Sequence, residues 1–379
     1  MTQATAAIIS QLPLDVVGGG ERFTLHTHRS ALVCGEVVDL WSAAGGNPPL
    51  EPHQRRMTHP YHKVSHIGGK PVPTETITLR DLLCRQADYD TVVVHQHLVN
   101  ASTLDILSAA APTQKIFLTS LGAEPISELF AKAYEPHSGV EIVEISRYAA
   151  ERVAARGMKA SSQSAGVWRA DVAPPTPRPA SPELRAIAIG RLLPHKAFEV
   201  AVDAVANLAP SVSLTIVGPS SGDAEYERYL AAMTGRSRNC HVAGYLDDNA
   251  RITALARADV LLANSAHLTY SGKRLDQPEL LGLVIVEAIA HGVLPIASDI
   301  PSFREICEQL GLERWIYPER NSEALRDLLL AVQAMSPSQR CRIVRDAAER
   351  LTHGYLWDDY WLRLTTRVSA RPVVLSRAA

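Results

Sequence analysis

This sequence lacks cysteines at the regular spacing that disulfide frameworks and zinc sites require. Its five cysteines are odd in number, lie far apart and never form a C-x-x-C pair; they are Cys34, Cys84, Cys240, Cys307 and Cys341. Disulfide-rich domains and structural zinc sites both need regularly spaced cysteines. The sequence therefore argues against both classes, and we expect a protein of the reducing cytoplasm.

A dominant charge and a long apolar run are missing too. The formal net charge is -2, which gives no global attraction for nucleic acid, so an anionic ligand would have to be held locally. No apolar run approaches the length that spans a bilayer, and the first residues lack the basic stretch of a secretory signal. We expect no nucleic-acid partner and membrane contact that is at most peripheral.

The composition that remains is that of a globular protein. Its 379 residues, 46% hydrophobic and 21% charged, are enough for two domains of ordinary size. A proline-dense segment, Ala173 to Glu183, cannot easily be helical and is typical of an extended connector. The sequence thus predicts one domain over residues 1–175, a second over 176–355, and a C-terminal helix over 356–379 that packs back on the first domain.

Apolar runs alternate regularly with amphipathic stretches after the connector. The runs at 186–190, 213–218, 260–265 and 294–299 predict βα units around a parallel sheet. Weaker runs at 6–10, 36–41, 91–95, 115–120 and 140–146 predict a similar sheet before it. We expect the α/β class, with two Rossmann-like, doubly wound domains facing an interdomain cleft that holds the ligand. The polar residues 45–73, rich in Pro and His, are expected to form a long irregular loop.

Two glutamates near an apolar helical run are the first candidates for chemistry. Glu279 precedes the run and Glu287 lies inside it, with Gly282 between them. An isolated buried carboxylate is expensive, so Glu287 either reaches solvent or meets hydrogen-bond donors in a pocket. The start of this helix also offers unpaired amides, from about Gly282 through Leu283 to Val284, that suit a phosphate.

Two further segments suit an anionic ligand. Arg191 and Lys196 follow a strand that ends at Gly190, and cations at such a strand exit are placed to meet an anion, although solvated loop charges would give the same pattern. A glycine run that includes Gly19 and Gly20 follows the first strand, where a backbone without side chains lets a phosphate or sugar approach.

These segments together resemble the retaining, GT-B-fold glycosyltransferases of family 4. The resemblance is carried by "GGGER", "GRLLPHK", "VAGYLDDNARITALARADVLLANS" and, above all, the E-x7-E spacing of Glu279 and Glu287. It implies that Glu279 contacts the transferred sugar and that Glu287 holds the ribose hydroxyls of the nucleotide. It further implies that Arg191 and Lys196 bind the diphosphate, with the remaining donor contacts from Gly19, Gly20, Gly244, Tyr245, Gly282, Leu283 and Val284.

The chain departs from this family at several positions. Where many relatives carry a histidine near the end of one strand, this sequence carries Leu118. The alternative His-x-His pattern matches His95 and His97, and we expect His97 to contact the donor sugar, although a histidine that only satisfies a strand end is a close alternative. Leu280 replaces a small residue, and residues 266–277 form an insertion ahead of Glu279.

The resemblance implies a hexosyl-type glycosyltransferase of the EC 2.4 class. We expect transfer with retention from a nucleoside-diphosphate sugar to a small soluble acceptor, with no metal and no further cofactor; the D-x-D at Asp88 to Asp90 is expected to be a polar turn rather than a metal site. A GT-B-fold nucleotide-sugar epimerase and a catalytically silent donor-binding subunit remain as alternatives, and the oligomeric state, including a homodimer, is left open.

Overall fold

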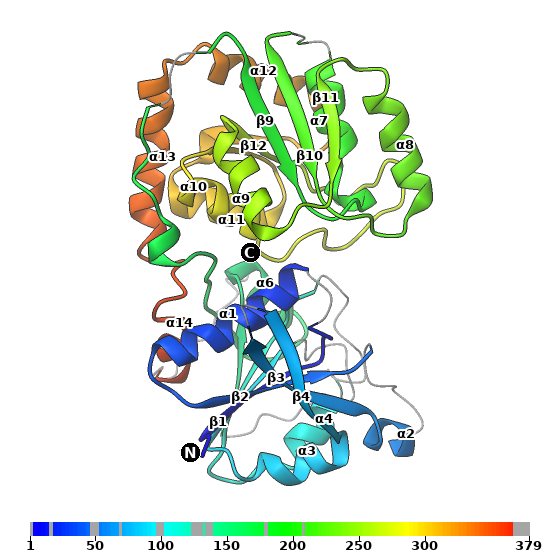
Figure 1. Cartoon of the computed structure of the whole chain (residues 1–379), viewed down its shortest axis with the longest axis vertical. Coiled ribbons are helices and arrows are strands. Elements are labelled where there is room, and N and C mark those ends of the chain that lie inside the picture. Colours follow the sequence, from blue (N-terminus) through cyan, green and yellow to red (C-terminus); the bar gives the residue numbers. More distant parts are fainter. Residues whose placement is uncertain are drawn as a thin grey trace, which may run out of the picture. The chain divides into compact units, whose positions relative to one another are not determined.

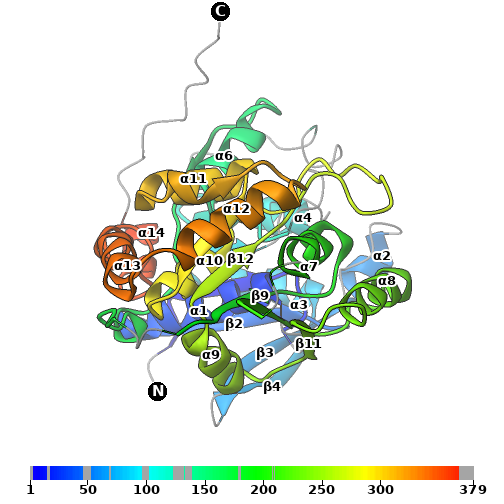
Figure 2. The same cartoon turned by 90° about the horizontal axis from the view of Figure 1, so that it is seen from above.

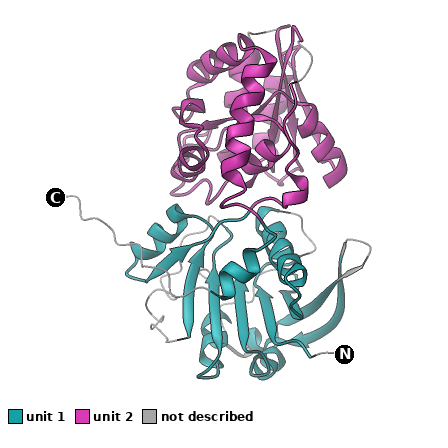
Figure 3. Cartoon of the chain, turned by 90° about the vertical axis from the view of Figure 1, so that its left-hand side faces the viewer, with its two compact units in different colours: residues 1–165, 357–379 teal, residues 166–356 magenta. Residues whose placement is uncertain are grey.

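The computed structural model describes residues 3–14, 18–45, 53–67, 70–95, 102–122, 132, 139–177, 181–206, 208 and 210–366. The chain forms two compact units, residues 1–165 with 357–379 and residues 166–356 (Figure 3). The change of unit precedes the proline-dense connector because residues just after Ala165 bond to unit 2. Gly166 and Val167 donate backbone hydrogen bonds to the carbonyl of Tyr355, and Ala173 donates to Ala290.

Unit 1 is built around a mixed sheet. Its described strands follow the order β4-β3-β2-β1-β5-β6-β7-β8, in which only the β2–β3 and β3–β4 pairs are antiparallel. The strands are β1 (Ala6–Ser10), β2 (Val38–Ala43), β3 (Pro60–Ile67), β4 (Lys70–Thr78), β5 (Thr91–His95), β6 (Lys115–Thr119), β7 (Val140–Glu144) and β8 (Ala160–Ser162). The helices are α1 (Gly19–Val33), α2 (His53–Met57), α3 (Leu79–Gln86), α4 (Ser102–Ser108), α6 (Arg147–Ala154) and α14 (Tyr360–Thr365).

Packing between chain segments far apart in sequence completes unit 1. The ring of Phe23 on α1 lies edge-on to Trp357 and Tyr360, with centroid distances of 4.7 and 5.6 Å. The backbone amide of Trp361 donates to the Ser30 hydroxyl at 3.0 Å. Residues after 356 therefore pack on the first helix of the same unit.

The expectation that residues 45–73 form an irregular loop is wrong for the part that the structure describes. This stretch holds α2, β3 and residues 70–73 of β4; β3 and β4 pair as an antiparallel hairpin. Proline is tolerated in β4 because it is an edge strand, whose outward backbone positions need no ladder hydrogen bond. The buried Tyr61 anchors the hairpin, since its hydroxyl donates to Gln11 at 2.6 Å.

Unit 2 is a fully parallel α/β structure. Its described strands follow the order β11-β10-β9-β12-β13-β14. They are β9 (Leu184–Ile189), β10 (Val212–Val217), β11 (Cys240–Gly244), β12 (Val260–Ala263), β13 (Leu294–Ser298) and β14 (Ile316–Tyr317). The helices are α7 (Phe198–Ala206), α8 (Ala224–Thr234), α9 (Asp248–Arg257), α10 (Leu283–Ala290), α11 (Pro301–Leu310), α12 (Ser322–Gln333) and α13 (Pro337–Leu351), with the short 3-10 helices η1 (Arg169–Asp171), η2 (Pro194–Lys196) and η3 (Glu313–Trp315).

The helices of unit 2 cover both faces of its sheet. Helix α7 contacts α8 and α12, whereas α10 and α11 contact α13. Figures 1 and 2 show α7 and α8 on one side of the strands and α10 with α13 on the other. Strands covered on both faces must be apolar throughout, and all of β12 and β13 are buried. The expected α/β class with two Rossmann-like sheets is confirmed.

None of the helices in the described part of the chain is both long and apolar enough to cross a membrane.

Candidate functional site

Three neighbouring strands of unit 2 end in glycine at the same edge of the sheet. Gly190 follows β9, Gly218 follows β10 and Gly244 ends β11. A Cβ atom at Gly218 would lie 1.7 Å from the carbonyl oxygen of Gly190, so no side chain fits between these strand ends. Gly244 has a φ of 74°, which glycine adopts without strain. This edge therefore exposes backbone where parallel α/β sheets bind ligands.

A cation and an acid meet beside the end of β9. The Lys196 ammonium forms an ion pair with the Glu279 carboxylate, and both side chains are about one-fifth exposed, at 22% and 23%. The lysine stem turns back over Gly190, since a Cβ atom there would lie 3.7 Å from its Cδ and Cε atoms. The next residue, Ala197, has a left-handed φ of 45°, which ends η2 and redirects the chain into α7. Two of the sequence-predicted residues are thus in contact.

His195 shows that Arg191 belongs to the same cluster. Burial, together with the Lys196 and Arg191 charges, lowers the pKa of His195 to about 4, while Glu279 opposes this shift. The imidazole is therefore neutral at pH 7. Arg191 is exposed, and no acidic side chain in the described part of the chain pairs with it. Its guanidinium is available to an anion from outside.

The second acid, Glu287, already has a cationic partner. Arg251 on α9 donates from Nη1 to Glu287 Oε2 at 2.8 Å, and the two side chains are 12% and 21% exposed. Burial lowers the pKa of His291, one turn further along; Glu287 raises it and Arg251 lowers it. The donors that Glu287 requires therefore include a guanidinium of the chain itself.

The helix that carries Glu287 begins at a residue that must be glycine. Gly282 caps α10 with a φ of 99°, and a Cβ atom there would lie 2.6 Å from the Phe303 ring. Leu283 and Val284 follow at the first helical positions, where backbone amides have no acceptor within the helix. Both side chains are half-buried. Tyr245, in contrast, is 61% exposed beyond β11.

The insertion of residues 266–277 is an ordered hairpin attached to this cluster. Ala266 donates its backbone amide to the carbonyl of His195 at 2.9 Å, and the chain returns at Glu279 to contact Lys196. The two ends of the hairpin therefore contact two consecutive residues, His195 and Lys196. Its own backbone is closed by hydrogen bonds from Thr269 to Lys273 and from Leu275 to His267.

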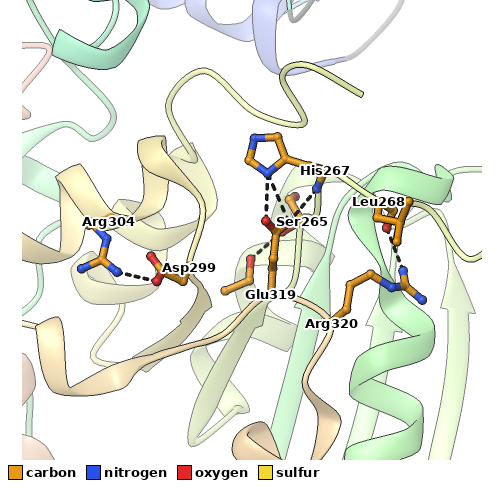
Figure 4. Close-up of polar contacts among 8 residues, drawn as sticks. Ser265, His267, Leu268, Asp299, Arg304, Glu319 and Arg320 are labelled. Carbon is orange, nitrogen blue, oxygen red and sulfur yellow. Dashed lines mark hydrogen bonds and ion pairs between the residues drawn. The ribbon is translucent and has the colours of Figure 1, made fainter. Parts of the chain in front are cut away.

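Glu319 and Arg320, which follow β14 in the chain, hold the base of the hairpin (Figure 4). Glu319 accepts from the backbone amide of His267 at 2.7 Å and contacts its Nδ1 at 3.1 Å. Arg320 donates to the carbonyl of Leu268 at 2.9 Å. At the far side, the ring of Tyr270 stacks on Tyr229 of α8 with a centroid distance of 4.7 Å. Neither Glu319 nor Arg320 was among the sequence-predicted residues.

The sequence-predicted residues of unit 1 lie at its own strand ends. A Cβ atom at Gly19 would meet no atom within 4 Å, whereas one at Gly20 would lie 2.9 Å from Leu12 Cδ1 and 3.2 Å from Leu121 Cβ, so the space around Gly20 is tight. His95 is fully buried with Nδ1 2.8 Å from the Thr24 hydroxyl, and burial lowers its pKa to about 3. His97 lies outside the described residues. His95 is thus a neutral histidine buried at a strand end, where Thr24 contacts its Nδ1.

Two other sequence expectations in unit 1 have structural outcomes. Leu118 is fully buried in the core cluster beside Val94 and Ile142, so it does not face a ligand. Residues 88 to 90 form a turn into β5, as expected, and Asp90 donates its amide to the carbonyl of Thr5 at 2.8 Å.

Arg251 is the functional candidate that sequence reasoning missed. The helix pattern contained a signal for it, because Arg251 lies one turn before Leu255, which is fully buried. Residues four apart share a helix face, so a charge at this position points toward the protein and requires a partner. Only the fold identifies that partner as Glu287.

Comparisons with known proteins find a family match within the second half of the chain. Residues 175–350 match the family described as Glycosyl transferases group 1. A phosphatidyl-myo-inositol mannosyltransferase of Mycobacterium tuberculosis (strain CDC 1551 / Oshkosh) is 31% identical over 146 residues, 37% of this chain and 35% of that protein. The match thus spans about one-third of that relative's length. The enzyme of the same name from Mycolicibacterium smegmatis (strain ATCC 700084 / mc(2)155) is 27% identical over 370 residues, 90% of this chain and 88% of that one.

A solved structure shows the same fold over the whole chain. Anabaena Alr3699/HepE, crystallised in complex with UDP and glucose, superimposes with a TM-score of 0.67 at 14% identity, covering 96% of this chain and 98% of that one. At this identity the likeness defines the fold, which is GT-B. Residues 175–350 thus match the family of glycosyl transferases group 1, within a chain of GT-B fold.

Proposed function

We propose that this glycosyl transferases group 1 chain is a retaining hexosyltransferase that uses a nucleoside-diphosphate sugar as donor. The observation that carries the proposal is the cluster at the exit of β9, where the Lys196–Glu279 pair and Arg191, which has no acidic partner among the described residues, all act on the pKa of His195. The open amides at the start of α10 add donors for a phosphate. The family match of unit 2 and the UDP complex of a structural neighbour support a nucleotide donor.

The chemistry follows from where charge develops. Breaking the anomeric bond places negative charge on the diphosphate and positive character on the sugar. Arg191 and Lys196 are fixed cations at the leaving group, and Glu279 faces the sugar as an acid already held by Lys196. An ammonium has three donors, so its pairing with Glu279 leaves capacity for a phosphate oxygen. Because these two cations take up the leaving charge, we propose that the reaction needs no metal.

Retention and the acceptor complete the proposal. The acceptor attacks the face that the diphosphate leaves, and the departing phosphate oxygen takes the acceptor's proton. We propose a small, soluble acceptor in the cytoplasm. The two mycobacterial relatives named as phosphatidyl-myo-inositol mannosyltransferases supply a second candidate, mannosyl transfer to an inositol-bearing lipid.

The test is a donor and acceptor panel in the presence of EDTA. Purified protein is incubated with UDP-glucose or GDP-mannose and with soluble polyols, myo-inositol or vesicles that contain phosphatidylinositol. Nucleoside diphosphate release and the anomeric configuration of the product are measured. A changed but intact donor would indicate an epimerase, and binding without turnover a silent subunit. Loss of activity in EDTA, or a product of inverted configuration, would refute the corresponding part of the proposal.

Lys196→Met supplies the residue-level test. Removal of one preorganised donor at a site of developing charge typically lowers kcat by about 10²–10³, and we expect a loss of this size. Lys115→Met removes an exposed lysine at the start of β6 in unit 1 and should leave kcat unchanged. Wild-type kcat in Lys196→Met would show that this ammonium does not stabilise the leaving group.

A further inference from the structure

The Arg251–Glu287 pair joins two helices of unit 2 at the edge where the proposed donor binds. Arg251 lies in the first half of α9, which begins after the cap residue Asp247. Its Nη1 donates to Glu287 at 2.8 Å, while its Nε lies 3.5 Å from Asp248 Oδ1 and is buried without a hydrogen bond. The guanidinium therefore donates a hydrogen bond to Glu287, which lies on the otherwise apolar helix α10.

Stability alone gives a weak reason for this pair. Replacing a buried ion pair by well-packed apolar side chains is often neutral or stabilising, and α10 is otherwise formed by Leu, Val, Ile and Ala side chains. Glu287 also keeps 21% of its side chain exposed. A carboxylate has about four lone-pair sites, so a carboxylate that accepts from Arg251 can also accept from further donors.

We propose that Arg251 is a positioning residue of the nucleotide site. It holds Oε2 of Glu287 so that the carboxylate faces the two ribose hydroxyls, and its charge cancels that of the acid next to a diphosphate. This inference rests on the proposed function, in which Glu287 accepts hydrogen bonds from the ribose. A bare carboxylate in this position would repel the diphosphate of the same ligand, whereas a paired one binds the hydroxyls without that penalty.

The experiment compares ribose and deoxyribose ligands. UDP, GDP and their 2′,3′-dideoxy counterparts are titrated into the wild-type protein, Arg251→Met, Arg251→Lys and Glu287→Gln by calorimetry. Arg257→Met is the matched control, because Arg257 is an exposed arginine on the same helix. The quantity of interest is the ratio of the dideoxy to the ribose dissociation constant, which a purely structural role of Arg251 would not change.

We expect the wild-type protein to prefer the ribose ligand. In Arg251→Met the ribose ligand should bind about tenfold more weakly, as expected when hydrogen bonds to a charged group are lost, and the ratio should fall toward one. Arg251→Lys, which keeps the charge but not the planar guanidinium, should also lower the ratio, and it decides the question if Arg251→Met does not fold.

The outcomes separate the two proposals. A wild-type ratio that persists in both Arg251 variants would overturn this inference and leave the proposed function intact. An unchanged ratio in Glu287→Gln would instead refute the ribose assignment. Failure of the wild-type protein to bind either nucleoside diphosphate would overturn the proposed function, and this inference with it.

Discussion

Replacement of Arg320 is expected to destabilise unit 2 and loosen the hairpin of residues 266–277. The Arg320 guanidinium donates to the buried Glu199 carboxylate at 2.9 Å and to the carbonyl of Leu268 at 2.9 Å. The side chain of Glu199 is only 5% exposed. Its other oxygen accepts from the Tyr226 hydroxyl at 2.8 Å, so Arg320→Ala would leave a buried carboxylate with one neutral donor.

The magnitude follows from this geometry. Removal of one partner of a buried ion pair costs about 3–5 kcal/mol, and the remaining Tyr226 bond places this case near 3 kcal/mol. Arg320 also has a left-handed φ of 62°, which costs a residue with a side chain about 1 kcal/mol relative to glycine. Arg320→Gly loses the same contacts but relieves the backbone strain that Arg320→Ala keeps, so it should be about 1 kcal/mol more stable than Arg320→Ala.

Hydrogen exchange with mass spectrometry is the suitable assay, because a two-unit chain need not unfold in a single step. Amides of residues 266–277 and of α7 should exchange roughly a hundredfold faster in Arg320→Ala, while those of unit 1 keep their protection. Arg326→Ala is the control, since Arg326 lies on the following helix and its ion pair, with the exposed Glu323, is long at 4.0 Å. Equal protection in Arg320→Ala and Arg326→Ala would refute the reasoning.

Two further predictions concern stability. Burial raises the pKa of Glu144 to about 8. The folded state therefore binds a proton that the unfolded state has already released, and stability is lost as the pH rises from about 4.5 through 8. Between pH 6.5 and 8 the free energy of unfolding of unit 1 should fall by about 1.5 kcal/mol. This slope should vanish in Glu144→Gln and persist in Glu141→Gln on the same strand, and its survival in Glu144→Gln would contradict the assignment. Gly282→Ala must place a methyl group 2.6 Å from Phe303 at a φ of 99°, which should cost about 3 kcal/mol or more, whereas Gly354→Ala, where a Cβ meets nothing within 4 Å, should remain near wild type in urea denaturation.

Strands were predictable from the sequence because burial on both faces leaves a continuous apolar run. The runs that end at Ser10, His95 and Ser298 are all strands of the structure. The hairpin of β3 and β4 was missed because an edge strand is half-solvated and tolerates proline. Its alternation is also interrupted by a register shift between Lys63 and Val64. The local sequence pattern therefore does not predict a strand of which only one face is covered by the rest of the protein.

Parts of the candidate site were equally readable from local spacing. The structure places Arg191 and Lys196 after the end of β9 and Gly282 at the start of α10, which are the positions in the fold that the local pattern predicted. The hairpin of residues 266–277 was visible only as an insertion. Its anchors, Glu319 and Arg320, lie about fifty residues further along the chain, at separations of 52 residues from His267 and Leu268. No periodicity connects such positions.

Glu287 shows both the reach and the limit of reasoning from residues. Burial of an isolated carboxylate is costly, so an acid on an apolar helix implies a donor. The sequence alone nominated ligand hydroxyls, whereas the structure supplies Arg251 from a position 36 residues earlier. The cost of burying a carboxylate shows that Glu287 needs a hydrogen-bond donor. Only the fold shows that Arg251 on α9 provides it. In the proposed site, a nucleotide that uses Glu287 shares an acid already paired with Arg251, and we expect this pairing to lower the repulsion between that carboxylate and the diphosphate.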